Sequence, residues 1–345
     1  MLVTDATMPD TDAYRRVATT MDRVWPGRWK SFAGVHPNPT EADAGHGYEQ
    51  YAGTGCDSLV GVGGGSAIDG AKAILLRVAC PDQALAEIEL GHLPPHIAPL
   101  CAVPTTAGTG SEVGQSAVIT SSGLGQKLLL GAPALLPALA ILDPELTLGL
   151  PPSITAATGM DAMTHAIESF VCPVFHPMCD GIALEAIYRV RTWLPRAVRD
   201  GSDIEARGQM LVAAAMGAVA FQKDLGAAHS MAHALGTELG IHHGLANAVV
   251  LSTTIRFNGE QDTRQYERVA IALGIAPESD PAAAVADAID ALNREIAIPP
   301  RLRDLGVAEG DIARLAENAA KDPCHATNPR ACSEPDFAQL FREAW

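Results

Sequence analysis

Histidines are concentrated in one short stretch of this chain. The segment GAAHSMAHALGTELGIHHG, residues 226–244, holds four of the eleven histidines: His229, His233, His242 and His243. His229 and His233 are four residues apart, so on a helix their imidazoles share one face. Several imidazoles on one apolar face favour a site for a divalent transition metal over an isolated core histidine.

A second segment carries a polar pair with the same spacing. GMDAMTHAIESF, residues 159–170, places Asp161 and His165 four positions apart in an apolar stretch. Two helices that each offer such a pair can meet at a shared polar centre, where imidazoles and one carboxylate suit a divalent ion. From spacing alone, the predicted ligands are Asp161, His165, His229 and His233.

Two glycine-rich turns in the first half of the chain could hold a nucleotide. GVGGGSAIDGAKA (61–73) follows an apolar strand and opens a helix, so its backbone could approach a phosphate at the helix N-terminus. PTTAGTGSEV (104–113) also follows a strand, and its hydroxyls suit pyrophosphate and ribose. Neither is the GxGxxG fingerprint, and a tight turn or a Ser/Thr-rich surface loop is the alternative for each. Two such turns at adjacent strand ends predict a dinucleotide site.

Asp5 stands at the end of the first apolar strand. A carboxylate in this place can accept both hydroxyls of an adenosine ribose and repel a 2′-phosphate, which would select NAD over NADP. An acidic turn or helix-cap residue is the alternative interpretation.

The elements that must position these residues fall into two halves. Residues 1–5, 58–66, 98–106 and 138–145 have the pattern of buried strands with helical stretches such as 67–78 between them, which predicts a mostly parallel sheet covered by helices. After Pro152 the sequence is Ala-rich with helical periodicity and no comparable strand signal. We therefore expect an α/β domain over 1–148 and an all-α domain over 149–345. The helices expected in the second domain cover 153–170, 180–198, 203–221, 280–296 and 333–345.

Composition limits the partners and the compartment. Forty acidic and 24 basic residues give a net charge of −16, which repels phosphate backbones and anionic lipids, so nucleic acid and membrane partners are not expected. No segment reaches the roughly 20 apolar residues that span a bilayer, and the first residues do not resemble a signal peptide. Seven scattered cysteines without a CxxC pair argue against a disulfide framework and for a cytoplasmic protein.

Four motifs together resemble those of the iron-containing, group III alcohol dehydrogenases. They are GGGSxxDxxK (63–72), PTTAGTGSE (104–112), GMDAMTHAIE (159–168) and HSMAHALG…HHGLANAV (229–249). The resemblance covers almost the whole chain. It implies a Rossmann-like NAD-binding domain and a helical domain, an architecture similar to that of dehydroquinate synthase, with metal and nicotinamide in the cleft between them. It also implies a metal-dependent, NAD-linked alcohol dehydrogenase or aldehyde reductase that uses Fe(II), or Zn(II) in its place.

The family pattern changes the predicted ligand set. The four family ligands match Asp161, His165, His229 and His243. His233 matches a histidine that lines the nicotinamide and substrate pocket, and we expect it to move the proton in catalysis. His242 matches no assigned role.

The resemblance also implies cofactor contacts. Gly64, Gly65 and Ser66 would meet the pyrophosphate. The residues expected to line the rest of the cofactor are Thr105, Thr106, Thr109, Ser111, Asp69 and Val113. Lys127 and Asn38 would approach its riboses.

The expected substrate is a short-chain alcohol, a diol or an ω-hydroxy acid, or the matching aldehyde. Residues 220–236 and 175–187 are similar to segments of 4-hydroxybutyrate dehydrogenase and lactaldehyde reductase, which are the two specific alternatives. The family also suggests a homodimer or a higher homo-oligomer.

The chain begins almost at the strand LVTD. Family members carry a leading strand or hairpin and a helix before the strand that matches LVTD, so either the coding start is misassigned or the protein is a short variant. In a short variant we expect the nucleotide domain to lack these elements and to leave a sheet edge unpaired. Glycerol dehydrogenase and dehydroquinate synthase resemble this architecture with a three-ligand zinc site, against which the four-residue set argues. A truncated protein that binds NAD or metal without turnover is the alternative from another class.

Overall fold

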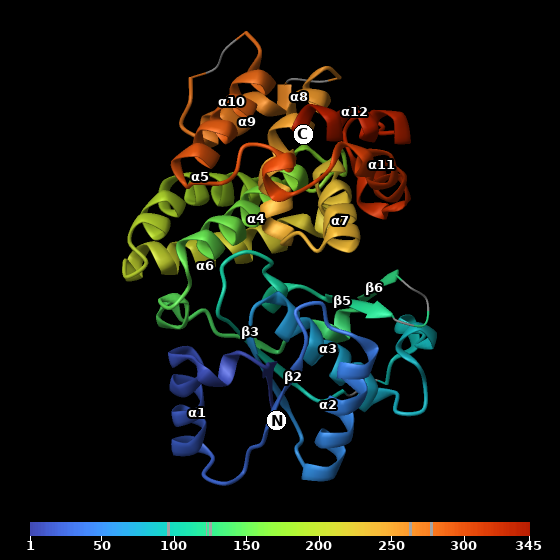
Figure 1. Cartoon of the computed structure of the whole chain (residues 1–345). Helices are drawn as coiled ribbons and strands as arrows, with labels where there is room; N and C mark the ends of the chain where they lie inside the picture. Colours follow the sequence, from blue (N-terminus) through green and yellow to red (C-terminus); the bar gives the residue numbers. More distant parts are fainter. Residues whose placement is uncertain (95–96, 122, 124–125, 262–263, 277–278) are drawn as a thin grey trace. The chain divides into compact units, whose positions relative to one another are not determined.

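Two sets of elements make up the chain: a parallel sheet with its helices in Met1–Gly149, and a group of helices in Leu150–Trp345 (Figure 1). The computed structural model describes every residue except 95–96, 122, 124–125, 262–263 and 277–278. The domain boundary expected after residue 148 lies at the end of the first set. Each set has the internal packing of a separate domain.

Five parallel strands form the sheet of the first unit, in the order β2-β1-β3-β4-β7. They are β1 (Leu2–Asp5), β2 (Ser31–Val35), β3 (Leu59–Gly63), β4 (Leu100–Pro104) and β7 (Leu139–Ala140). The main helices between them are α1 (Asp12–Val24), α2 (Glu41–Thr54) and α3 (Gly65–Ala79). The expected parallel α/β fold is confirmed. β1 lies inside the sheet, between β2 and β3, so it is not an edge strand.

Two features of this unit differ from what the sequence predicts. β2 has the sequence SFAGV, in which only Phe32 and Val35 are buried, so it lacks the continuous apolar run of a central parallel strand. The strands β5 (Ser116–Ser121) and β6 (Gln126–Gly131) form an antiparallel hairpin. β5 alternates buried and partly exposed residues, and its serines and threonine weaken the apolar signal of that alternation.

A buried lysine joins α3 to the loop that follows β4. Lys72 Nζ donates to the backbone oxygens of Ser111 (2.7 Å), Gly114 (2.9 Å) and Ser116 (2.7 Å). One turn earlier on α3, the carboxylate of Asp69 accepts hydrogen bonds from Ser111 Oγ at 2.5 Å and from a backbone N–H of β5 at 3.0 Å. The two glycine-rich motifs are therefore fixed to each other through buried polar contacts.

The described part of Leu150–Trp345 contains nine α-helices and no strand, which confirms the expected all-α half. They are α4 (Pro152–Val171), α5 (Pro177–Arg199), α6 (Ile204–Ala220), α7 (Ala227–Leu239), α8 (His243–Gly259), α9 (Arg264–Ala272), α10 (Pro281–Glu295), α11 (Ile312–Lys321) and α12 (Glu334–Ala344). The helices predicted by periodicity are α4, α5, α6, α10 and α12. Proline occupies one of the first two positions in four of these five, where its missing N–H costs nothing.

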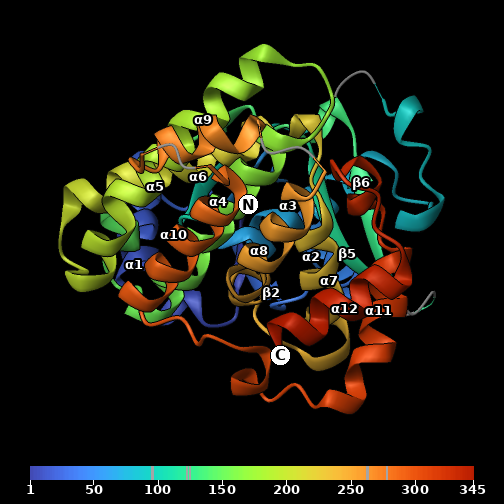
Figure 2. The ribbon, with the colours of Figure 1, turned by 90° about the horizontal axis from the view of Figure 1, so that it is seen from above.

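α4 is the central helix of the second unit. It is buried along almost its whole length and packs against α5, α6 and α8. Figure 2 shows α4 and α8 between α5 and α10 on one side and α7, α11 and α12 on the other. A Cβ at Gly159 of α4 would lie only 2.3 Å from Cδ1 of Leu194 in α5, so a larger residue here would displace this buried leucine side chain.

One described helix is long and apolar enough to cross a membrane by length and composition alone, contrary to the expectation that no segment is. It comprises α6 and the turn after it, Ile204–Lys223, and more than half of its apolar stretch is buried. Buried core helices of soluble proteins can have the same length and composition. Within this helix Arg207 is buried and donates to Thr155 Oγ1 at 2.7 Å and to the backbone oxygen of Gly201 at 3.0 Å. These contacts are those of a core helix.

Glu112 gives the first unit a pH-dependent stability. Its side chain is buried in the loop after β4, and this burial raises the pKa of its carboxyl from 4.5 to about 7, although the nearby Lys72 acts in the opposite direction. The folded protein therefore binds this proton more tightly than the unfolded chain. For this group, stability is highest below about pH 4.5 and decreases as the pH rises to about 7.

We expect Glu112→Gln, which removes the ionisation and keeps the shape, to stabilise the protein at pH 8 by roughly 1–3 kcal/mol. The same substitution should change stability little at pH 4.5. Thermal unfolding of wild type and variant at both pH values measures the difference. A variant that is no more stable than wild type at pH 8 would contradict the assignment.

Candidate functional site

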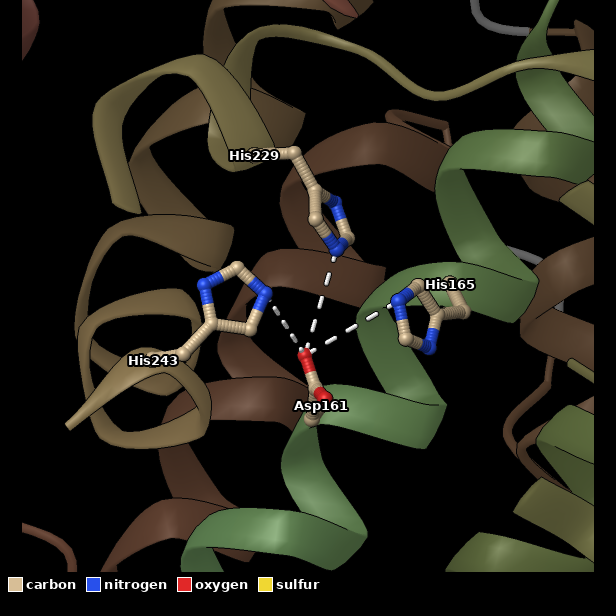
Figure 3. Close-up of side chains that lie close together, drawn as sticks. All are labelled: Asp161, His165, His229 and His243. Carbon is tan, nitrogen blue, oxygen red and sulfur yellow. Dashed lines mark ion pairs between the residues drawn. The ribbon is translucent and has the colours of Figure 1, made fainter. Parts of the chain in front are cut away.

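Four side chains of the second unit converge on one point (Figure 3). Asp161 Oδ1 lies 3.4 Å from His243 Nε2 and 3.9 Å from the Nε2 atoms of both His165 and His229. One ligand atom from each residue lies within 4.8 Å of the other three. A tetrahedral ion with bonds of roughly 2.1 Å separates its ligand atoms by about 3.4 Å. The four atoms are therefore spaced to surround a metal.

Three helices bring these residues together. α4 places Asp161 and His165 one turn apart, α7 supplies His229, and His243 is the first residue of α8. The approach of α8 to α4 depends on Gly244, where a Cβ would stand 2.2 Å from a backbone oxygen of α4. A side chain at this position would push His243 away from Asp161.

The chemistry of the donor set fits a divalent cation. The side chains of Asp161, His165 and His229 are at most 5% exposed, whereas that of His243 is 38% exposed. A buried carboxylate faced by imidazole nitrogens is stabilised by a cation at their centre. The exposed side of His243 leaves access to the site.

Asp161 is ionised at neutral pH, as a metal ligand must be. Its burial favours a higher pKa, but the three histidines and a hydrogen bond from Asn247 outweigh burial and lower the pKa to about 2. Asn247 Nδ2 donates to Asp161 Oδ1 at 2.8 Å and lies 3.3 Å from the Nε2 atoms of His229 and His243. The amide thus holds the carboxylate oxygen toward the other ligand atoms.

His233 lies beside this cluster and not in it. Its Nδ1 is 2.8 Å from Asp322 Oδ2, and its ring stacks on that of His243 with centroids 5.2 Å apart. The ligand set predicted from spacing alone, with His233 in place of His243, is therefore not the set whose ligand atoms converge. The four residues that do converge are those implied by the family resemblance. His242 precedes α8 and is not one of the four converging residues.

Three further residues at this site were missed in the sequence. Asn247 follows His243 by four positions and Glu168 follows His165 by three, so the helical spacing that marks the histidines extends to both. Asp322 reaches His233 across 89 positions. No local pattern signals such a contact.

The carboxyl edge of the sheet in the first unit has the topology of a nucleotide site. The connection after β1 runs to β2 on one side of the sheet and the connection after β3 runs to β4 on the other, so the strand order reverses between β1 and β3. Open α/β sheets bind their ligands at such a switch point, outside the carboxyl ends of the strands. β1 ends at Asp5, β3 at Gly63 and β4 at Pro104. The backbone N–H of Thr105 donates to the Gly63 oxygen at 2.9 Å, which places the two glycine-rich turns side by side.

The predicted pyrophosphate residues Gly64, Gly65 and Ser66 form the N-terminus of α3. Backbone N–H groups at a helix N-terminus bind phosphate. A Cβ at Gly65 would lie 2.7 Å from Thr109 Oγ1, so the second turn closely covers the first. Ser66 Oγ donates to the backbone oxygen of Pro37, next to the exposed Asn38.

The other predicted cofactor residues fall into two groups. Partly exposed residues, which can reach a ligand, are Thr106, Thr109, Val113 and Lys127. Thr105, Ser111 and Asp69 are buried. Because Ser111 and Asp69 bond to each other, and Lys72 lies 3.0 Å from Ser111 Oγ, the structure favours a supporting role for these two residues.

The contacts of Asp5 are consistent both with a turn residue and with a carboxylate that binds a ribose. Its Oδ1 accepts hydrogen bonds from Thr7 N (2.8 Å), Thr7 Oγ1 (2.6 Å) and Met8 N (3.1 Å), as a turn residue does. Its Oδ2 faces the end of β3, since a Cβ at Gly63 would lie 3.6 Å from it. One carboxylate oxygen therefore fixes the turn and the other points to the switch point.

Comparison with known proteins identifies the family of this chain. The family model for iron-containing alcohol dehydrogenase matches residues 1–144, and the model for the C-terminal part of the Fe-containing alcohol dehydrogenase family matches residues 155–345. The chain belongs to the iron-containing alcohol dehydrogenase family. The predicted enzyme class, a metal-dependent, NAD-linked alcohol dehydrogenase, is confirmed at this level.

Individual family members are similar over most of their length. A 4-hydroxybutyrate dehydrogenase from Cupriavidus necator is 43% identical over 320 residues, which cover 89% of this chain and 82% of that protein. The crystal structure of a 1,3-propanediol oxidoreductase has a TM-score of 0.95 at 35% identity and covers 100% of this chain and 91% of its own. A sulfoacetaldehyde reductase from Bifidobacterium kashiwanohense, solved in complex with NAD+, has a TM-score of 0.89 at 31% identity, with 99% and 90% covered.

We expect Asp161→Asn to weaken binding of Co(II) or Zn(II) by more than roughly 10–100-fold. That range is the usual effect of losing a residue that only hydrogen-bonds to a metal ligand. Asn has the same shape but lacks the charge that the cation needs. Competition with a chromogenic chelator measures the affinity. Asp322→Asn is the matched control, because Asp322 also contacts a histidine but lies outside the four-residue cluster. Equal metal affinities in the two variants would contradict the ligand assignment.

Proposed function

We propose that this protein oxidises a short-chain alcohol or ω-hydroxy acid with NAD, and reduces the matching aldehyde, with a divalent metal held by four residues. These are Asp161, His165, His229 and His243. The observation that carries the proposal is the convergence of their ligand atoms beside the His233–Asp322 pair. When bound, the metal would supply Lewis acidity at the substrate oxygen and the nicotinamide would exchange the hydride.

His233 is our candidate for the residue that moves the proton. Its Nδ1 faces Asp322, so its Nε2 is available to accept a proton from the substrate hydroxyl or from water. Burial of Asp322 favours a higher pKa, but the hydrogen bond and charge of His233, with bonds from Cys324 N and Ser230, hold the pKa of that carboxyl well below its usual range. The ionised Asp322 fixes the orientation of the His233 ring. The side chain of His233 is 29% exposed, which gives the proton a route to solvent.

The metal and the substrate are the more specific parts of the proposal. Three imidazoles and a carboxylate bind several divalent metals. We favour Fe(II) because of the family, with Zn(II) as the alternative. We favour 4-hydroxybutyrate as substrate because a relative of that activity is 43% identical to this chain. Lactaldehyde is the second candidate.

We also propose a cytoplasmic homo-oligomer. All seven cysteines are free thiols, as in proteins of reducing compartments. Phe175 and Met178, at the connection between α4 and α5, are 89% and 75% exposed. Apolar side chains this exposed are typical of a surface that contacts another subunit.

The first experiment follows NADH in protein purified without oxygen and loaded with Fe(II) or Zn(II). The alcohols are ethanol, butanol, 1,2-propanediol, 1,3-propanediol and 4-hydroxybutyrate, and the reverse reactions use the aldehydes, including lactaldehyde. We expect metal-dependent turnover that is lost in His243→Ala. His233→Gln should keep wild-type metal affinity and lower kcat by roughly 10²–10⁴-fold, the usual effect of losing a proton-transfer group.

Other outcomes would decide against the proposal. Turnover that persists without metal, or in His243→Ala, would contradict the metal-dependent mechanism. Binding of NAD and metal without turnover of any compound would support the non-catalytic alternative.

Asp5→Asn tests the preference for NAD. Asn retains an Oδ1 that accepts the three turn hydrogen bonds, but it lacks the charge that repels a 2′-phosphate. We expect the ratio of kcat/KM for NADP to that for NAD to rise roughly 10–100-fold, because like charges in contact cost several kcal/mol. Thr7→Ala, which removes one of the turn bonds and keeps the charge, is the control. An unchanged cofactor ratio in Asp5→Asn would remove Asp5 from the cofactor site.

A further inference from the structure

Glu168 is a buried carboxylate that the four-residue ligand set does not include. It lies on α4 and is 4% exposed. Its Oε2 is 2.6 Å from His229 Nδ1 and accepts a hydrogen bond from Gly226 N at 3.1 Å. Its Oε1 accepts from Ala228 N at 2.7 Å. Both oxygens are therefore engaged by donors at the start of α7.

These contacts replace the missing cap of α7. Gly226 is the N-cap residue and has no side chain to accept from the first free N–H groups of the helix. Glu168 accepts two of them, and Asn328 Oδ1 accepts a third, from Ala227 N at 3.2 Å. A Cβ at position 226 would lie 2.8 Å from Glu168 Oε1 and from Asn328 Oδ1. A side chain at position 226 would therefore displace the carboxylate from the helix N-terminus.

The same carboxylate determines how His229 presents its ring. A carboxylate can only accept, so His229 Nδ1 carries the proton and Nε2 keeps its lone pair. This Nε2 is the atom that faces Asp161 Oδ1 at 3.9 Å. The hydrogen bond also fixes the ring plane and makes Nε2 a stronger electron donor.

We infer that Glu168 is the positioning residue of the metal centre: it locks His229 in its metal-binding tautomer and orientation, and thereby increases the affinity for a divalent cation. The inference rests on the metal site of the proposed function. The carboxylates of Asp161 and Glu168 together carry two negative charges, which match the charge of a divalent ion. Asp161 would bind the ion directly, whereas Glu168 would act through His229.

The test measures Co(II) affinity of metal-free protein by chelator competition, together with the visible spectrum of the Co(II) form. Glu168→Gln should bind Co(II) roughly 10–100-fold more weakly than wild type, with shifted absorption bands. Asn328→Ala is the matched control. It removes an acceptor from the same helix N-terminus but does not contact His229, so its Co(II) affinity should stay near that of wild type.

A purely structural role predicts a different result. In that case Glu168→Gln and Asn328→Ala both lower the melting temperature of the metal-free protein, and both keep the wild-type affinity and spectrum. Unchanged Co(II) affinity in folded Glu168→Gln would overturn the inference.

If Glu168→Gln does not fold, nitrogen NMR of histidine-labelled wild-type protein gives the answer. Protonated Nδ1 and bare Nε2 at His229 support the inference, and the reverse tautomer overturns it. Failure of the proposed function is recognised separately, because in that case wild type and Asp161→Asn bind Co(II) equally weakly.

Discussion

The helical unit depends on the electrostatic cost of a carboxylate removed from water. Asp161 is 3% exposed and ionised, so its charge must be balanced within the protein interior. Only nearby groups can do this, and three imidazoles and the amide of Asn247 come within 3.9 Å of its Oδ1. Helices can deliver these groups only if they pack closely. Glycines provide this closeness on two sides of α4, at Gly244 of α8 and at Gly217 of α6, where a Cβ would stand 3.2 Å from a backbone oxygen of α4.

In the first unit the predicted nucleotide site relies on backbone groups and not on buried charge. Its predicted pyrophosphate contacts are backbone groups at the N-terminus of α3, which need little side chain and much space. The charged residues of the same motifs, Asp69 and Lys72, lie behind the turns and hold the loop after β4 in place. In the second unit the buried charge of Asp161 lies among the candidate metal ligands. In the first unit the buried charges of Asp69 and Lys72 support the loop and do not line the predicted cofactor site.

The parts of the molecule that could be predicted are those in which residue types recur at the spacing of a helix or a strand. The pairs Asp161–His165 and His229–His233 follow helical spacing, so they correctly indicated two helices and a polar centre. The same spacing selected His233 in error, because the chain turns between α7 and α8 and brings His243 to Asp161 from a separate helix. The resemblance supplied His243, which spacing could not.

Features that depend on tertiary contacts were not accessible from the sequence. The strand β2 and the hairpin β5–β6 are only partly buried, so their apolar pattern is weak. The partner of His233 is Asp322, which lies far along the chain and reaches it only in the folded state. The burial of Asp69 likewise depends on the loop after β4 folding over α3.

The arrangement of the four candidate ligands makes the bound ion a cross-link. A metal at this point would join α4 to α7 and α8 through ligands that lie about 70 residues apart along the chain, and this binding is possible only in the folded state. By mass action, free metal at about 1,000 times its dissociation constant stabilises the folded state by about 4 kcal/mol. The supply of metal would therefore govern how long the protein survives heat and proteolysis as well as whether it turns over.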